Sequence, residues 1–176
     1  MRRLAVLVPV LAAGRAAPAG AQVAAAAPAR ADDARVAVWG GAGLGLSSAG
    51  ALLHLDVSHH RAARLLRGRL TAHSNLGGLG TRPDESVTEV SALVGRGAVC
   101  CGGNWGSASA GGGVVLGRLG SDAIQFTTVG LAAEAALVSR RRPHLAVTAF
   151  ANANPKRSFA GVSLSLVLGR VPFAGR

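Results

Sequence analysis

Most of the chain alternates between apolar residues and small or polar residues with a period of two. Successive side chains of a β-strand point to opposite faces, so this period separates an apolar face from a polar one. In segment 50–60, Leu53 and Leu55 share one face. His54 and Asp56 share the other face. Eight segments with this pattern follow one another, at 36–47, 50–60, 64–75, 87–96, 106–118, 126–139, 144–152 and 158–168.

The breaks between the segments are short, and most of them contain turn-forming residues. They fall at 48–50, 60–63, 77–84, 101–104, 120–122, 140–143 and 152–156. Gly, Pro, Asn, Asp and Ser favour tight turns, and every break is short enough for a hairpin. The pattern therefore predicts an antiparallel meander. The centre of 126–139 also fits a helix, because Ala and Glu favour helices.

The length of the segments distinguishes two kinds of barrel. They approach the roughly 9–11 residues that a tilted membrane strand needs and exceed the mode of about 5–6 residues in soluble sheets. We therefore predict an all-β fold, a single antiparallel up-and-down transmembrane β-barrel of about eight strands. The apolar face of such a barrel points to lipid and the polar face lines the lumen, whereas a soluble barrel encloses its apolar face.

The polar face carries Ser, Thr, Gly and a few isolated charges instead of the dense Lys and Glu of a soluble surface. An unpaired charge in a dry interior is strongly destabilising. Opposite charges that share the lumen offset each other's desolvation. We therefore predict a paired luminal charge network, formed by Asp56, Arg67, Arg69, Glu89 and Glu134.

The N-terminus has the pattern of a secretory signal peptide. Arg2 and Arg3 precede an apolar core at 4–13, and Ala-Gly-Ala at 19–21 is a small-x-small cleavage site. We predict a signal peptide over 1–21, a disordered lead-in over 22–34 and the β-barrel domain over 35–173. Cleavage later in the alanine run stays open. The apolar core is too short for a helix that crosses a bilayer of about 30 Å.

The signal peptide, the eight alternating segments and a last strand at 162–168 ahead of Phe173 resemble the small eight-stranded outer-membrane β-barrel proteins of Gram-negative bacteria. The resemblance covers roughly 36–173. It implies an outer-membrane location, contact with outer-membrane lipid, a monomer, and folding by the barrel-insertion machinery. In that family the last strand usually ends at a C-terminal aromatic residue, whereas three residues follow Phe173 here.

An even number of strands places both termini on the periplasmic side. The loops at 76–85 and 152–156 then face outward, and Cys100, Cys101 and the turn at 140–142 face the periplasm. Membrane barrels also carry aromatic girdles at the two interfaces. The candidates for these girdles are Trp39, Trp105, Phe126, Phe150, Phe159 and Phe173.

Charge and cysteine content exclude other classes. The net charge of +11 is compatible with nucleic-acid binding, but the basic residues lie mainly in the N-terminal segment, in turns and at alternate strand positions, so we expect no nucleic-acid partner. Outside the extreme N-terminus no run of about 18 apolar residues occurs, which excludes a helical membrane bundle. The adjacent Cys100 and Cys101 predict a loop thiol pair, not a structural disulfide, and no metal site.

We expect no catalytic site and no cofactor. Alternation places His73 and Ser74 on opposite faces, so they do not form a lipid hydrolase pair. The glycine strings at 40–45 and 111–113 lack the Lys-Ser/Thr of a phosphate loop and leave room in a narrow lumen instead.

The leading prediction is a structural or interaction role in the cell envelope, with a narrow, porin-like channel as a variant. The alternatives are a soluble exported barrel that carries a small apolar ligand and a lipid-modifying outer-membrane enzyme.

Overall fold

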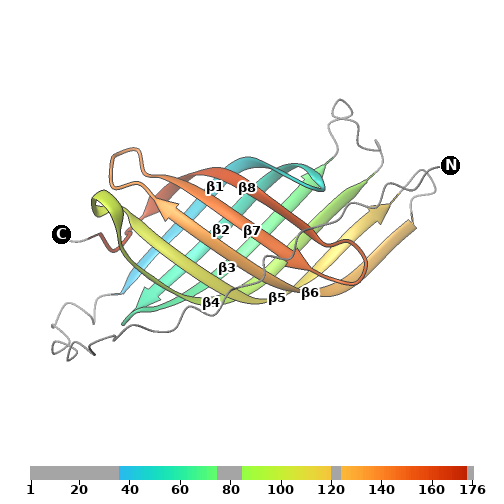
Figure 1. Cartoon of the computed structure of the whole chain (residues 1–176), viewed down its shortest axis with the longest axis horizontal. Helices are drawn as coiled ribbons and strands as arrows, with labels where there is room; N and C mark the ends of the chain where they lie inside the picture. The colour runs from blue at the N-terminus through green and yellow to red at the C-terminus, as the bar shows by residue number, and fades with distance from the viewer. Residues whose placement is uncertain (1–35, 75–84, 120–123, 174–176) are drawn as a thin grey trace, which may run out of the picture. The chain divides into compact units, whose positions relative to one another are not determined.

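The computed structural model describes residues 36–74, 85–119 and 124–173, which form a closed barrel of eight antiparallel strands (Figure 1). Each strand pairs with its neighbours in sequence, and β1 pairs with β8. The predicted signal peptide, the lead-in and most of the loop at 76–85 lie outside the described residues. The strands are β1 (Ala37–Ser47), β2 (Gly50–Arg61), β3 (Arg64–Ser74), β4 (Ser86–Val99), β5 (Trp105–Leu119), β6 (Ile124–Val138), β7 (Leu145–Ala153) and β8 (Phe159–Gly169).

The predicted antiparallel up-and-down barrel of eight strands is confirmed. The segment at 126–139, whose composition also fits a helix, is strand β6. The described helical structure is a single 3₁₀ turn, η2 (Cys101–Gly103), between β4 and β5. No helix in the described ranges has the length and hydropathy needed to cross a membrane.

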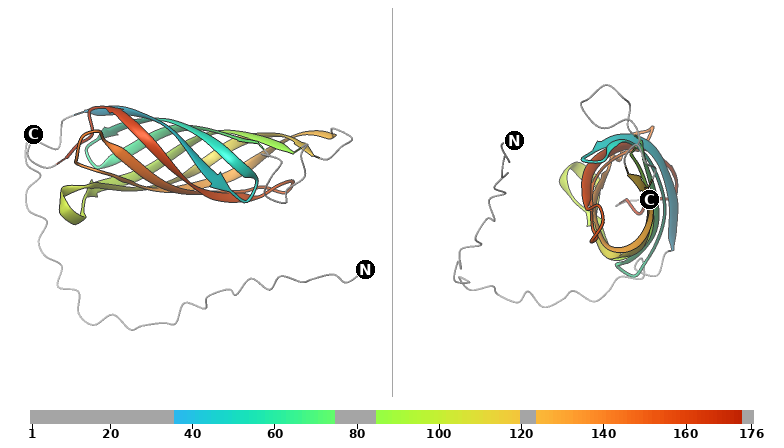
Figure 2. Two further views of the ribbon diagram at one scale, coloured as in Figure 1. Left: turned by 90° about the horizontal axis from the view of Figure 1, so that it is seen from above. Right: turned by 90° about the vertical axis from the view of Figure 1, so that its right-hand side faces the viewer.

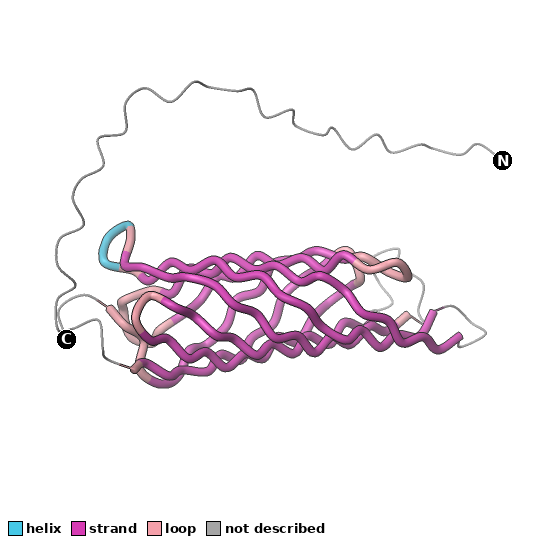
Figure 3. Tube along the Cα trace, turned by 90° about the horizontal axis from the view of Figure 1, so that it is seen from below, coloured by secondary structure: helices cyan, strands magenta, loops and turns pink. Residues whose placement is uncertain are grey.

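Closure of the barrel pairs the two strands farthest apart in sequence (Figures 2 and 3). Trp39 of β1 lies opposite Gly169 of β8, and Ser47 lies opposite Gly161. Closure satisfies the backbone groups that an open sheet would expose at its edges, which is a requirement for any sheet that spans a bilayer. One turn is unusual in its residues. Ala62 and Ala63 join β2 to β3 with φ values of 47° and 65°, a region that favours glycine or asparagine.

The two ends of the barrel differ in their connections. The end at which β8 finishes, called here the C-terminal end, carries the β2–β3, β4–β5 and β6–β7 turns. The opposite end carries the β1–β2 and β7–β8 turns. Because the strands alternate in direction, this division follows from their number and order alone.

The apolar rows of the barrel lie on its outside. Leu44 is 70% exposed, Val129 is 73% exposed and Leu131 is 75% exposed, and aliphatic residues of the other strands share this face. Most charged and hydroxyl side chains of the alternate positions are buried inside. The prediction that the apolar face points outward is therefore confirmed. The arrangement of a soluble carrier, with aliphatic rows enclosed around a ligand, is not the one observed.

Aromatic residues fill the two ends of the lumen instead of forming girdles. Near the C-terminal end, Trp39 and Trp105 meet edge to face, with ring centroids 6.2 Å apart. Near the opposite end, Phe150 and Phe159 are buried with aliphatic neighbours, and Phe126 packs against them. The expectation of aromatic girdles from these residues was wrong, because each lies on the inward-facing side of its strand or, as Phe173 does, folds inward beyond it.

Phe173 does not end the last strand. β8 stops at Gly169, whose φ of 113° turns the backbone. The residues that follow bring Val171 and Phe173 into the apolar cluster at the C-terminal end, where the Phe173 ring lies 5.0 Å from that of His144. This aromatic side chain therefore covers the end of the lumen.

Candidate functional site

Four strands direct charged side chains into the middle of the lumen. Asp56 of β2 lies opposite Arg69 of β3 in the strand register. Glu89 of β4 lies opposite Thr71, two residues beyond Arg69 on β3. Each of these residues occupies an inward position because its neighbours in sequence, such as Leu55 and Val57 beside Asp56, point outward. The strand pairing thus gathers the charges of β2, β3 and β4 on one side of the barrel.

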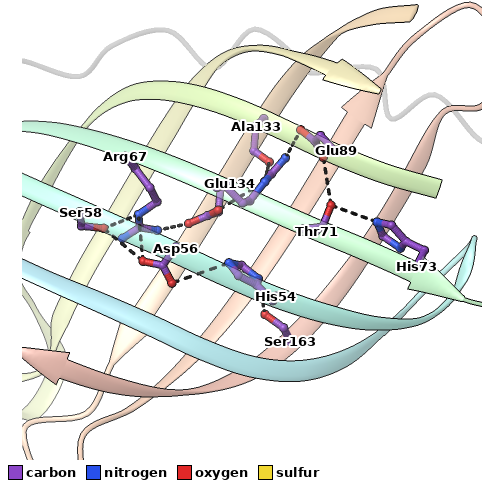
Figure 4. A network of polar contacts seen from close by, with 11 residues as sticks. His54, Asp56, Ser58, Arg67, Thr71, His73, Glu89, Ala133, Glu134 and Ser163 are labelled. Atoms are coloured by element: carbon purple, nitrogen blue, oxygen red, sulfur yellow. Dashed lines mark hydrogen bonds and ion pairs between the residues drawn. The ribbon is translucent and has the colours of Figure 1, made fainter. Parts of the chain in front are cut away.

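Glu134 of β6 reaches these charges from across the lumen (Figure 4). Its Oε1 forms an ion pair with Nη1 of Arg67. Its Oε2 lies 3.3 Å from Nη1 of Arg69. The side chain of Glu134 is fully buried, and those of the two arginines are 3% or less exposed. One carboxylate therefore bridges both guanidinium groups.

Each arginine has a second acidic neighbour. Nη2 of Arg69 donates to Oε1 of Glu89 at 2.7 Å. Nε of Arg67 donates to the Ser58 hydroxyl at 2.7 Å and lies 3.9 Å from a carboxylate oxygen of Asp56. The structure thus brings all five residues of the predicted luminal network together.

Sequence reasoning missed two histidines that extend the network. Nδ1 of His54 lies 2.8 Å from the Ser163 hydroxyl, and its Nε2 lies 3.8 Å from Asp56. His73 lies 2.7 Å from the Ser47 hydroxyl and 3.1 Å from that of Thr71. Both histidines sit at polar positions of their alternating segments, so the same period that located the charges also pointed to them.

Comparison with known proteins rests on structure alone. No protein-family model matches the chain. No curated protein matches it either. Neisserial surface protein A has a TM-score of 0.58 and 9% sequence identity, over 76% of this chain and 96% of that one. The attachment invasion locus protein Ail of Yersinia pestis has a TM-score of 0.53 and 11% identity, over 77% of this chain and 97% of that one.

A third structure is similar to about the same extent. The N-terminal β-barrel domain of Pseudomonas aeruginosa OprF has a TM-score of 0.52 and 13% identity, over 75% of this chain and 97% of that one. The fold is that of small eight-stranded outer-membrane barrels. At these sequence identities the similarity establishes the fold alone. The function of the chain has to be argued from its own residues.

The two serine–histidine contacts of this barrel differ in exposure, because Ser163 and His54 are both enclosed whereas Ser47, the partner of His73, is half-buried. Ser163 and His54 are 3% and 0% exposed, so an ester cannot reach them. His73 is 2% exposed and its ring lies against that of Phe159 in a tilted arrangement, with ring centroids 4.6 Å apart. Nucleophilic catalysis needs the serine, its base and the substrate in contact, and the enclosure of Ser163 and His54 keeps a substrate away from that pair. Ser74 is exposed on the outer face, away from His73, as the alternation predicted.

The described residues also contain a thiol pair at the C-terminal end. Cys100 and Cys101 are free, as predicted for a loop thiol pair; both are exposed, and their Sγ atoms lie 3.3 Å apart. The hydrogen bond to Cys101 raises the pKa of the Cys100 thiol above its ordinary value. Within 36–74, 85–119 and 124–173, no three His, Cys, Asp or Glu side chains gather as metal ligands.

Proposed function

We propose that the mature chain is an outer-membrane protein of a Gram-negative envelope, present as a monomeric barrel with a structural or interaction role. The observation that carries this proposal is the orientation of the faces. Aliphatic rows such as Leu44, Val129 and Leu131 are exposed, and the charges of Arg69, Glu89 and Glu134 are enclosed. Water would surround an apolar band far larger than monomeric soluble proteins expose, whereas lipid would solvate it.

The strand lengths support the same proposal. The described strands contain between 9 residues in β7 and 15 residues in β5 and β6. A tilted membrane strand needs about 9–11 residues. Every strand therefore has the length to cross the hydrocarbon layer, and the longer ones extend beyond it at one end or the other.

The filling of the lumen favours a structural role over a channel. The charge network occupies the middle, and apolar clusters around Trp105 and Phe150 lie on its two sides. An eight-stranded barrel has an interior only wide enough for its own side chains. We expect the purified barrel to show no steady conductance in a planar bilayer, and stable conductance steps would restore the channel variant.

The proposal assigns no catalytic activity to the chain. Expression of the protein in a Gram-negative host should leave the acyl chains of lipid A and phospholipids unchanged. Loss or transfer of acyl chains that depends on Ser47 or Ser163 would replace the structural role by an enzymatic one.

Cell fractionation combined with heat-modifiability tests the location. We expect the mature chain in the outer-membrane fraction, released only by detergent, with a gel mobility that changes on boiling because the folded barrel resists the gel detergent. Recovery of the folded chain in the soluble periplasmic fraction without detergent would support the soluble carrier instead.

A further inference from the structure

Three arginines lie side by side on the outer face at the C-terminal end. The strand register places Arg61 of β2 directly opposite Arg64 of β3, and Arg64 directly opposite Arg96 of β4. All three are exposed, and all three occupy outward positions of the alternation. Neighbouring strands therefore hold three positive side chains in one lateral row, called here the arginine row.

The arginine row places like charges next to one another, which is unfavourable unless a bound anion neutralises them. Side chains directly opposite each other have Cβ atoms about 4.5–5.5 Å apart, and like charges at such positions destabilise a sheet. Among the described residues, no carboxylate forms an ion pair with any member of the arginine row. Of the described carboxylates, Asp56, Glu89 and Glu134 face the lumen, and Glu85 pairs with Arg157 at the opposite end.

The arginine row borders the apolar band. The neighbouring outward row toward the middle of the barrel consists of His59, Leu66 and Val94, which pair in the same register. Guanidinium groups bind phosphate oxygens with two parallel hydrogen bonds, and long arginine side chains extend toward a polar interface while their stems lie on apolar surface. A ligand that spans both rows needs an anionic head and an apolar tail.

We propose that Arg61, Arg64 and Arg96 bind the phosphate of an anionic phospholipid headgroup, with the acyl chains of the same molecule against Leu66 and Val94. The inference rests on the proposed membrane location. On the predicted topology the C-terminal end faces the periplasm, so the lipid belongs to the inner leaflet. Free phosphate shares the headgroup chemistry but makes no use of the adjoining apolar row.

Native mass spectrometry of the full mature barrel in detergent micelles tests the site. The micelles are titrated with phosphatidylglycerol or with zwitterionic phosphatidylcholine, and bound lipid is counted. We expect phosphatidylglycerol adducts to exceed phosphatidylcholine adducts by at least about tenfold, since each arginine at a membrane surface contributes to the attraction of anionic lipid. The variant R61Q/R64Q/R96Q should lose this preference, and the single variant R64Q, which removes the middle of the row, should lose part of it.

The variant R140Q/R141Q/R142Q is the matched control, because it removes the same charge from an exposed turn at the same end. It should retain the preference for phosphatidylglycerol. An equal loss in both triple variants would show a diffuse charge effect and overturn the site. Displacement of phosphatidylglycerol by inorganic phosphate at similar concentration would assign the row to free phosphate and also overturn it.

The same samples separate this inference from the proposed function. Normal heat-modifiability of the wild type and of both triple variants in phosphatidylcholine, without selection of phosphatidylglycerol, would reject the lipid site and leave the membrane barrel intact. Failure of the wild type to fold in any lipid or detergent would reject the membrane barrel itself.

Discussion

Replacement of Arg69 by Met tests the energetic role of the luminal network. Arg69 is the one described cation that contacts both Glu89, at 2.7 Å, and Glu134, at 3.3 Å, and its side chain is fully buried. At an effective dielectric constant of about 20, these separations correspond to gross attractions of about 6 and about 5 kcal/mol. Desolvation of the ions offsets much of this attraction.

The net effect of the substitution is nevertheless large, because it leaves Glu89 buried with only the Thr71 hydroxyl, 3.4 Å away, as a hydrogen-bond donor. Removal of one partner of a buried ion pair costs about 3–5 kcal/mol, and we expect R69M to lower the free energy of unfolding by this amount. In the double variant R69M/E89Q the uncompensated charge is gone. Its loss of stability should be smaller than the sum of the single losses by more than about 1 kcal/mol.

Equilibrium unfolding in urea, in detergent micelles or thin vesicles, measures these differences. The fluorescence of Trp39 and Trp105 reports on unfolding, because both side chains are buried near one end of the lumen. Folding and unfolding curves must coincide for the free energy to be defined.

Arg157 provides the matched control for R69M. It pairs with Glu85 at 3.1 Å, but its side chain is 39% exposed. We expect R157M to cost less than about 1 kcal/mol, as exposed pairs do. A loss in R69M no larger than that in R157M, or additive losses in the double variant, would refute the reasoning.

Three further predictions test the faces of the barrel and the thiol pair. Leu131 lies in the middle of β6 and is 75% exposed. A positive charge at the bilayer midplane costs about 2–4 kcal/mol, so we expect L131R to fold poorly into vesicles. Normal folding of L131R would indicate that water, not lipid, surrounds this face. Gly111→Ala should lower the free energy of unfolding in urea by about 1–3 kcal/mol, because a Cβ at this position would overlap the Ala92 carbonyl oxygen. Gly112→Ala is the control, because the nearest atom to its Cβ would lie 3.8 Å away. Equal losses in the two variants would contradict the close strand packing at Gly111. The raised pKa of Cys100 lowers the fraction of its thiol that is ionised at any pH below that pKa. Iodoacetamide at pH about 8 should therefore alkylate Cys100 faster in C101A than in the wild type. An unchanged rate would show that the hydrogen bond to Cys101 does not cause the pKa shift.

The local periodicity was sufficient to predict the strands and their faces. Asp56, Arg67 and Glu134 were assigned to the lumen from alternation alone; Arg67 and Glu134 are buried there, and the side chain of Asp56 is 11% exposed. Trp39 and Phe150 also follow the alternation, although they were expected at the membrane interfaces. Both occupy inward positions of their segments, and the girdle expectation failed because it followed the resemblance to other barrels instead of the alternation.

The sequence pattern did not predict which side chains contact each other across the barrel. Glu134 is separated from Arg67 by 67 positions in the chain, and their pairing depends on how β6 is staggered relative to β3 once the barrel closes. The inward position of Phe173 has the same origin, since it depends on the turn at Gly169 and on the space that the luminal side chains leave.

The sequence by itself determined the all-β class, the number of strands, and which side chains share a face, because a strand alternates its side chains residue by residue and neighbouring strands follow one another in the chain. Only the tertiary structure decided which luminal charges meet, that the aromatic residues fill both ends of the lumen, and that Arg61, Arg64 and Arg96 form one row. These features depend on register and closure, which bring together residues that no local pattern relates.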